Sequence, residues 1–393
     1  MRAGPLFLSF SALSLSATAP ALAETWNLHP AISLKAADVY LSARNPADQY
    51  GSTYKAAEGQ LNLVREDVHS LWTTSGKLIQ AQANEAPYGE SQLRTSYQDR
   101  QKLSSSNFDL SYRQTHGFDP IGQLIEEAAN KDARSFESIY GGAFHQISLN
   151  VANDIGLYLG GGRNSEGDFT VESKDAQISW DHRHSVAWSS RIRLRLTDAE
   201  TRQKEIIQEH LYRFNPKLSS EISYGYAVQD NREETTGAAL WGVSMQYRTS
   251  GLLNSSSAYQ SIGNARNISP EEAESLRGAS LYKIGWTHSR DQRRSGDPYY
   301  YADIFYGSAV VEFWGKQTVE LKGSHSRASE HQLLDSEDDF QSGIIQGNYL
   351  LPHRFMARYP DALLTLGYSA ERTELPPRRY FREIYQASYA LVW

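Results

Sequence analysis

The sequence contains no cysteine among its 393 residues. This absence excludes a lipoprotein anchor, structural disulfides and thiolate chemistry. A cluster of basic residues is missing as well: 46 acidic residues stand against 39 basic ones, with a formal net charge of −7. A mildly acidic chain without a basic block is a poor nucleic-acid binder, so we expect no nucleic-acid partner.

Long apolar runs are also scarce. After the first 23 residues no stretch is apolar enough for a transmembrane helix, which excludes a helical membrane protein. The 24 Tyr and 8 Trp are nevertheless many for so polar a chain. Two classes remain: a soluble all-β protein, or a membrane barrel whose lipid-facing side chains alternate with a polar interior.

The first residues read as a secretory signal. Arg2 supplies a positive flank, residues 6–15 are apolar, and Ala21 and Ala23 form a small-x-small cleavage site. We therefore predict that residues 1–23 are a signal peptide removed after Ala23. A membrane anchor would need about 20 apolar residues, whereas this run is shorter and interrupted by serines.

Apolar and polar residues alternate with a period of two over stretches of about ten residues, as in a β-strand with two different faces. Ile222, Tyr224, Tyr226 and Val228 alternate with small or polar residues, and the same pattern recurs at 108–113, 239–248, 282–287 and 364–369. A soluble sandwich of this length would have some strands apolar on both faces. The pattern predicts that residues 24–393 form a single transmembrane antiparallel up-and-down β-barrel of about 18 strands, or 16 if weaker segments are loops.

Turn-forming residues divide the chain. Tight periplasmic turns are predicted near 66–67, 104–105, 153–154, 184–185, 215–216 and 315–316. Longer polar extracellular loops are predicted at 44–57, 117–141, 162–168, 230–236, 290–300, 327–337 and 372–380. Counting strands from both ends places residues 250–277 in a long connection on the periplasmic side.

Two short helices are predicted within these connections. Asp119 and Pro120 form a cap and first turn, and residues 269–272 form a capping box with proline at the first helical position. The first helix could fold into the lumen as a constriction. A surface helix on a loop is the favoured interpretation, because nothing in its sequence demands an interior site.

The last strand carries the most specific motif. Tyr385, Ala387, Tyr389, Leu391 and Trp393 share one face, and the printed sequence stops on the aromatic residue. This pattern resembles the C-terminal sorting signature of bacterial outer-membrane barrels. The resemblance implies export through the inner membrane and periplasm, capture by the barrel-assembly machinery through edge pairing, and a final place among the lipids of the Gram-negative outer membrane.

A shorter resemblance lies near the other end. Residues 26–34, Trp-Asn-Leu-His-Pro-Ala-Ile-Ser-Leu, are similar to the start of outer-membrane proteins that accompany exopolysaccharide and exosortase systems. It implies a role related to polysaccharide.

Aromatic and glycine clusters have simpler interpretations. Interfacial girdle positions are predicted for Trp72, Trp180, Trp188, Trp286, Trp314, Tyr349 and Trp393. Residues 160–162, three glycines, suggest a flexible hairpin tip. Residues 299–301, three tyrosines, suit either the girdle or stacking on sugar rings at a pore mouth.

Three arginines form the main candidate site. On the predicted strand 188–197, Arg191, Arg193 and Arg195 all point inward, opposite an apolar set. Guanidinium groups in a row along a lumen would attract an anionic solute or polymer and bias ion selectivity. The favoured alternative is pairing with acids on the neighbouring strands, for which the candidates are Asp175, Asp181, Glu205 and Glu209.

Covalent chemistry has weaker support. Residues 181–185 contain the residue types of a hydrolase triad, but adjacent side chains on a tight turn point away from one another. No residue spacing suggests a metal or cofactor site, and none is proposed. We therefore predict a channel or export pore that is not an enzyme, with a non-conducting assembly barrel and an outer-membrane hydrolase as alternatives.

Overall fold

The computed structural model describes residues 27–43, 49–67, 69–84, 86–121, 134–166, 169–199, 202–230, 235–249, 280–291, 300–312, 317–328, 340–354, 361–375 and 378–392. In these residues every regular element is a β-strand, and no helix there is long and apolar enough to cross a membrane. The strands are β1 (Asn27–Ala43), β2 (Tyr50–Glu66), β3 (Ser70–Ala83), β4 (Ala86–Arg100), β5 (Ser104–Gly117), β6 (Arg134–Ser148), β7 (Asn153–Glu166), β8 (Phe169–Arg183), β9 (Trp188–Asp198), β10 (Arg202–Asn215), β11 (Leu218–Asp230), β12 (Thr235–Arg248), β13 (Leu281–Asp291), β14 (Tyr300–Glu312), β15 (Thr318–Ala328), β16 (Phe340–Arg354), β17 (Asp361–Leu375) and β18 (Arg378–Val392).

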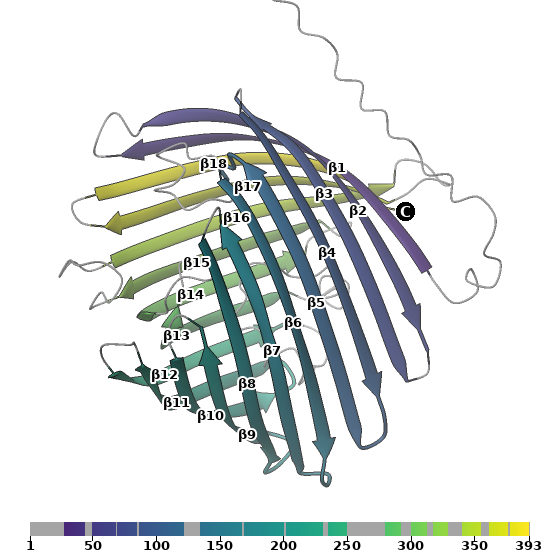
Figure 1. Ribbon diagram of the computed structural model, residues 1–393, viewed down its shortest axis with the longest axis vertical. Helices are drawn as coiled ribbons and strands as arrows, with labels where there is room; N and C mark the ends of the chain where they lie inside the picture. Colours follow the sequence, from purple (N-terminus) through teal and green to yellow (C-terminus); the bar gives the residue numbers. More distant parts are fainter. Residues whose placement is uncertain are drawn as a thin grey trace, which may run out of the picture.

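The strands close into a barrel. Each pairs antiparallel with its neighbour in the chain, and β18 pairs with β1 from Ala31↔Val392 to Ala43↔Tyr380. Figure 1 shows the first and last strands, purple and yellow, side by side at this seam. Closure pairs the backbone groups that an open sheet edge would leave free, which a bilayer requires. The prediction of one antiparallel barrel of about 18 strands is confirmed.

Strand order defines two ends of the barrel. The terminal end is where β1 begins and β18 ends, and the far end is the opposite one. Connections at 184–187 and 216–217 lie at the terminal end where turns were predicted. The long connection between β12 and β13 also falls at this end, as predicted.

Several predicted connections overlap strands. The turns predicted near 104–105 and 153–154 lie directly before these residues, at 101–103 and 149–152, whereas residues 50–57 and 134–141 lie in β2 and β6 instead of in loops. The error has a physical cause. Toward the far end the outer faces of β2 and β6 become small or polar, as at Thr53 and Glu137, so the alternation fades there while the backbone pairing continues.

The triple glycine at 160–162 corrects another prediction. These residues lie inside β7 and not at a hairpin tip. A Cβ at Gly160 would stand 2.2 Å from the Tyr158 hydroxyl, and one at Gly161 would stand 2.6 Å from the Ser173 carbonyl oxygen. The glycines therefore make room for a tyrosine ring and for close backbone approach within the wall.

The two faces of the wall differ in chemistry. On β11 the large apolar side chains of Ile222, Tyr224 and Tyr226 are exposed on the outside, whereas Glu221 and Gln229 of the opposite face are buried. An apolar outside and a polar inside are what a membrane barrel requires.

Aromatic rings gather on the outer face. Near the terminal end the Trp188 ring stacks on His184 at 3.8 Å and on Tyr212 at 5.7 Å between centroids, and Trp72 packs against Tyr97. Of the other predicted girdle residues, Trp180 and Trp286 are exposed on the outer face, and Tyr349 shares this face by its register. Trp314 and Trp393 lie outside the described residues.

Candidate functional site: the lumen wall

The predicted arginine ladder lies on β9, between β8 and β10, and faces the lumen. Arg191 forms a two-point ion pair with Asp181, in which its Nη2 donates to Oδ2 at 3.1 Å. Arg193 Nη2 lies 2.7 Å from Glu209 Oε1. The acids alternate between the two neighbouring strands: the first arginine binds β8, the second binds β10, and the third again binds β8.

That third arginine is Arg195. Its Nη2 lies 3.2 Å from Asp175 Oδ1, which also accepts a hydrogen bond of 2.7 Å from Thr197. All three arginines are thus paired with acids, as the favoured interpretation of the sequence expected.

The paired groups are not equally accessible. The side chain of Glu209 is 4% exposed, whereas that of Arg193 is 26% exposed. The same order holds for Asp175 at 7% and Arg195 at 32%. In these two pairs the arginine is therefore the more exposed partner.

A second series of ion pairs on β2 to β5 was not anticipated from the sequence. Arg113 Nη2 lies 3.0 Å from Glu90 Oε2, which also accepts a 2.7 Å hydrogen bond from the Tyr88 hydroxyl. Two further pairs join Lys77 to Glu58 at 3.6 Å and Arg94 to Asp109 at 3.4 Å. The available signal was opposite charge on the inward faces of consecutive predicted strands.

The connection after β5 begins inside the barrel. Phe118 is buried against the lumen-facing side chains of Val39, Tyr54 and Ile384. The carbonyl of Pro120 accepts a 3.0 Å hydrogen bond from Nη1 of Arg382 on β18.

This placement corrects the favoured surface position for the segment. Asp119 does accept the predicted capping hydrogen bond, from the amide of Ile121 at 3.1 Å. The available signal was Phe118, an aromatic residue directly before the cap that needs a buried partner. The remainder of this predicted helix, like the one predicted at 269–272, lies outside the described residues.

Residues 181–185 do not assemble a catalytic triad. Asp181 faces the lumen and binds Arg191, whereas His182 and His184 face outward. His182 shares a hydrogen bond of 2.8 Å with Asn153, and His184 shares one of 2.8 Å with Ser190. Acid and imidazole therefore lie on opposite faces of the wall.

The sorting motif lies on β18. Tyr385 is exposed on the outer face, and Ala387, Tyr389 and Leu391 follow on the same face. Trp393, and the cleavage-site residues Ala21 and Ala23, lie outside the described residues. The sorting role and the signal peptide stay predictions.

Similar solved structures identify the fold of the barrel. Pseudomonas aeruginosa OpdQ matches with a TM-score of 0.51 and 10% sequence identity, covering 93% of this chain and 100% of that one. The neighbours are outer-membrane porins. This barrel has the porin fold.

Two further porins from Pseudomonas aeruginosa match it. OccK11 (OpdR) has a TM-score of 0.50 at 10% identity, covering 93% of this chain and 96% of that one. OccK2 (OpdF), solved in complex with glucuronate, has a TM-score of 0.50 at 11% identity, covering 92% and 98%. No protein-family model matches the chain, and no curated protein sequence matches it either. At such low identity the likeness concerns the fold of the barrel alone.

Proposed function

We propose that the protein is an outer-membrane channel through which small hydrophilic solutes diffuse. The observation that carries the proposal is a closed barrel of 18 strands with an apolar outer face and a polar, ion-paired lumen. Barrels of about 16–18 strands are wide enough to enclose an aqueous channel. With its termini toward the periplasm, the barrel would present its far end to the outside.

The lumen wall favours anionic solutes. The side chains of Arg193 and Arg195 are more exposed than those of the acids that pair with them. An anion can therefore approach the cation while the buried carboxylate remains shielded behind it. The glucuronate bound in the OccK2 structure is an anionic sugar of suitable charge.

An acidic polysaccharide is the polymeric form of such a solute. The link to exopolysaccharide secretion still rests on the resemblance of residues 26–34 alone. It is included in the proposal because a row of partly exposed arginine side chains would suit a chain of uronate units.

The experiment is single-channel recording of the purified protein in a planar bilayer. We expect discrete conductance steps, and blocking events when glucuronate or an oligouronate is added on one side. Glucose at the same concentration is the matched neutral control and should cause fewer blocks. A protein that inserts but conducts no current would refute the channel and favour a non-conducting assembly barrel, whereas equal block by glucose would refute anion preference alone.

A further inference from the structure

The lumen face of β6 and β7 carries three aromatic rings. Tyr140 and Phe144 lie on β6 and Tyr158 lies on β7, in the part of the wall next to the arginine ladder (Figure 1). The register places Tyr158 in one row with Phe144 and, two strands further, with Arg195 of the ladder. The neighbouring Leu159 is instead exposed on the outer face. All three rings therefore face the lumen, and each is partly buried.

The ring of Tyr158 lies across two glycines. A Cβ added at Gly142 would stand 2.6 Å from its hydroxyl and 2.8 Å from a ring carbon, and one added at Gly160 would stand 2.2 Å from the hydroxyl. Gly142 and Gly160 are direct partners in the register of β6 and β7. The ring therefore lies along the wall, in space that two side chains would otherwise fill, and its other side is turned to the lumen.

The other two rings extend this surface along β7. A Cβ at Gly162 would stand 2.8 Å from a ring carbon of Tyr140, and one at Gly156 would stand 2.9 Å from a ring carbon of Phe144. These two glycines are separated by about 20 Å along the strand. The hydroxyls of Tyr140 and Tyr158 share a hydrogen bond, which holds the two rings end to end. We call the three rings the aromatic strip.

An ion pair lies on each side of the strip. The row of the register that contains the two glycines under Tyr158 continues to Asp109 of β5 on one side and to Asp175 of β8 on the other. Each acid is thus about 4.8 Å from one of these glycines. Asp109 pairs with Arg94 at 3.4 Å, and Asp175 pairs with Arg195 at 3.2 Å. The arginine side chains are 61% and 32% exposed, so a solute on the strip can reach both.

This combination of groups suits a sugar ring. A pyranose has a face of C–H groups that can pack on an aromatic ring, and its hydroxyls both donate and accept hydrogen bonds. On the strip, the C–H face would contact Tyr158, while hydroxyls accept from Arg94 or Arg195 and donate to Asp109. An open-chain polyol offers the same hydroxyls without a rigid apolar face, so it would lose the stacking contact.

Another lumen tyrosine lacks this arrangement. Tyr306 on β14 also lies over a glycine, because a Cβ at Gly285 would stand 2.4 Å from its hydroxyl. The ammonium group of Lys283, however, lies over the Tyr306 ring, 5.5 Å from its centroid. Among the described residues, neither a cation nor a second ring contacts Tyr158 in this way. The two tyrosines therefore differ in whether a solute can stack on them.

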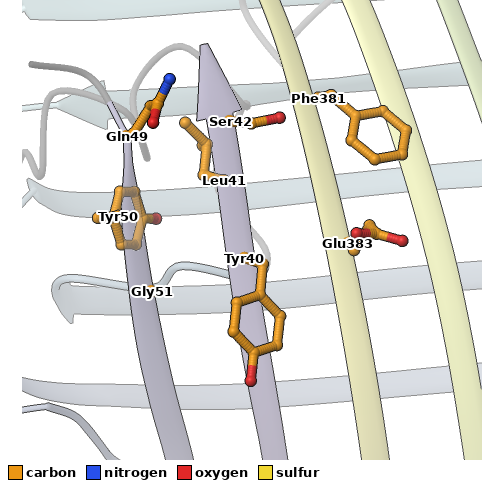
Figure 2. A pocket seen from close by; sticks show the side chains of 8 residues that line it. All are labelled: Tyr40, Leu41, Ser42, Gln49, Tyr50, Gly51, Phe381 and Glu383. Carbon is orange, nitrogen blue, oxygen red and sulfur yellow. The ribbon is translucent and has the colours of Figure 1, made fainter. Parts of the chain in front are cut away.

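Aromatic residues on the outer wall cannot bind a solute in the lumen. Figure 2 shows a hollow of about 300 Å³ at the barrel seam, with Tyr40 of β1 beside Phe381 and Glu383 of β18. Tyr40 and Phe381 are exposed on the outer face. This hollow therefore opens away from the lumen, whereas the aromatic strip lies on its wall.

We propose that the aromatic strip binds the pyranose rings of sugars that pass through the lumen, with Tyr158 as the stacking surface and the two flanking ion pairs as hydrogen-bond partners of the sugar hydroxyls. The proposal rests on the proposed channel function and names the class of solute that this wall recognises: ring-shaped sugars, charged or neutral. It differs from attraction of anions by the arginine ladder, because it depends on the shape of the solute and not on its charge.

The test compares ring-shaped with open-chain solutes of equal charge. Glucuronate and gluconate are both monovalent anions, but only glucuronate closes into a pyranose ring; glucose and sorbitol are the matching neutral pair. Single-channel recording in a planar bilayer measures the dwell time of each blocking event. Within each pair the ring-shaped solute should dwell about fivefold longer than the open-chain one.

Four variants locate the effect. Tyr158→Ala removes the ring and should abolish the difference within each pair, whereas Tyr158→Phe keeps the ring and the difference. Gly160→Ala should also reduce the difference, because its Cβ would displace the hydroxyl end of Tyr158. Tyr306→Ala is the matched control: it removes a lumen tyrosine that lies over a glycine and should leave the difference unchanged. Each recorded channel is folded and inserted, so a lost preference does not reflect misfolding.

Equal dwell times for ring-shaped and open-chain solutes in the original protein would overturn the proposal. So would a preference that survives Tyr158→Ala, or one that falls equally in Tyr306→Ala. Conducting channels without ring preference would leave the proposed function standing.

A protein that conducts nothing would overturn the channel, and the strip is then tested by saturation-transfer NMR of the same four solutes with the detergent-solubilised protein. Ring preference that Tyr158→Ala abolishes would support the strip without the channel. Equal saturation of ring-shaped and open-chain solutes would overturn the strip as well.

Discussion

Replacing Glu209 by glutamine should shift the ion selectivity of the lumen toward anions. Glu209 is the buried partner of Arg193, and its carboxylate lies 2.7 Å from the guanidinium group. Glu209→Gln keeps the size of the side chain and adds one unit of positive charge to the wall. This change in net charge does not depend on which acid Arg193 contacts in the variant.

The size of the shift follows from Coulomb's law. A unit charge about 8 Å from a passing ion changes the energy of that ion by roughly 0.5 kcal/mol in water. Anions gain this energy and cations lose it, so the anion-to-cation permeability ratio should rise about fivefold at low salt. At 0.1 M salt, where the Debye length is about 10 Å, screening should reduce the rise to about twofold. Loss of a charged hydrogen bond should also lower the free energy of unfolding by roughly 1–3 kcal/mol.

The assay is the reversal potential of single channels under a salt gradient, measured at two salt concentrations. The matched control is Glu209→Gln combined with Arg193→Gln, which restores the net charge of the pair and should return the reversal potential to that of the original protein. An unchanged reversal potential in the single variant, or the same shift in the double variant, would refute the reasoning.

Three further changes test the wall, the inner segment and the lipid face. Gly225→Val should prevent folding, because its Cβ would lie 2.2 Å from the carbonyl oxygen of Ile206; gel mobility with and without boiling measures this, and a normal heat-modifiable band would contradict it. Arg382→Gln should raise single-channel conductance by releasing the carbonyl of Pro120 from the wall, and unchanged conductance would show that the segment does not narrow the lumen. Leu194→Arg places a charge on the exposed outer face of β9 and should lower the free energy of unfolding in lipid vesicles by about 2–4 kcal/mol, whereas equal stability would mean that lipid does not contact this position.

Alternation made the barrel predictable from the sequence. A strand between lipid and water needs one apolar face and one wettable face, and Ile222, Tyr224 and Tyr226 show this division in the sequence and in the structure alike. Pairing with the next strand through a short turn then sets the register. The number of strands follows once each such segment is counted.

Connections at the far end were less predictable because their signals are local. Asn84 has a positive φ of 52°, and its Oδ1 accepts a 3.1 Å hydrogen bond from the amide of Thr53, so it makes a tight turn that the alternation did not reveal. Asparagine tolerates this left-handed conformation, and its presence was the available signal.

Burial of Phe118 depends on Tyr54 and Ile384, which are distant in the chain. No local pattern brings such residues together.

The inward direction of the arginine ladder could be predicted, and its pairing only in part. Asp175, Asp181 and Glu209 were all among the candidate partners. Which arginine binds which acid depends on the diagonal reach of the side chains: Arg193 lies opposite Ile207 in the register, yet it binds Glu209 two residues along β10. Reach of this kind follows from strand twist and rotamers and is not encoded in residue spacing.

The seam between β1 and β18 has a consequence for biogenesis. Thirteen positions of β1 are matched with thirteen of β18, so the cylinder cannot close until β18 has been made. Pairing between strands so far apart in the sequence makes assembly slow. A variant that lacks β18 would leave two open sheet edges. The unpaired backbone N–H and C=O groups on each edge are too costly to expose to hydrocarbon. Such a product should therefore fail to insert altogether instead of forming a smaller pore.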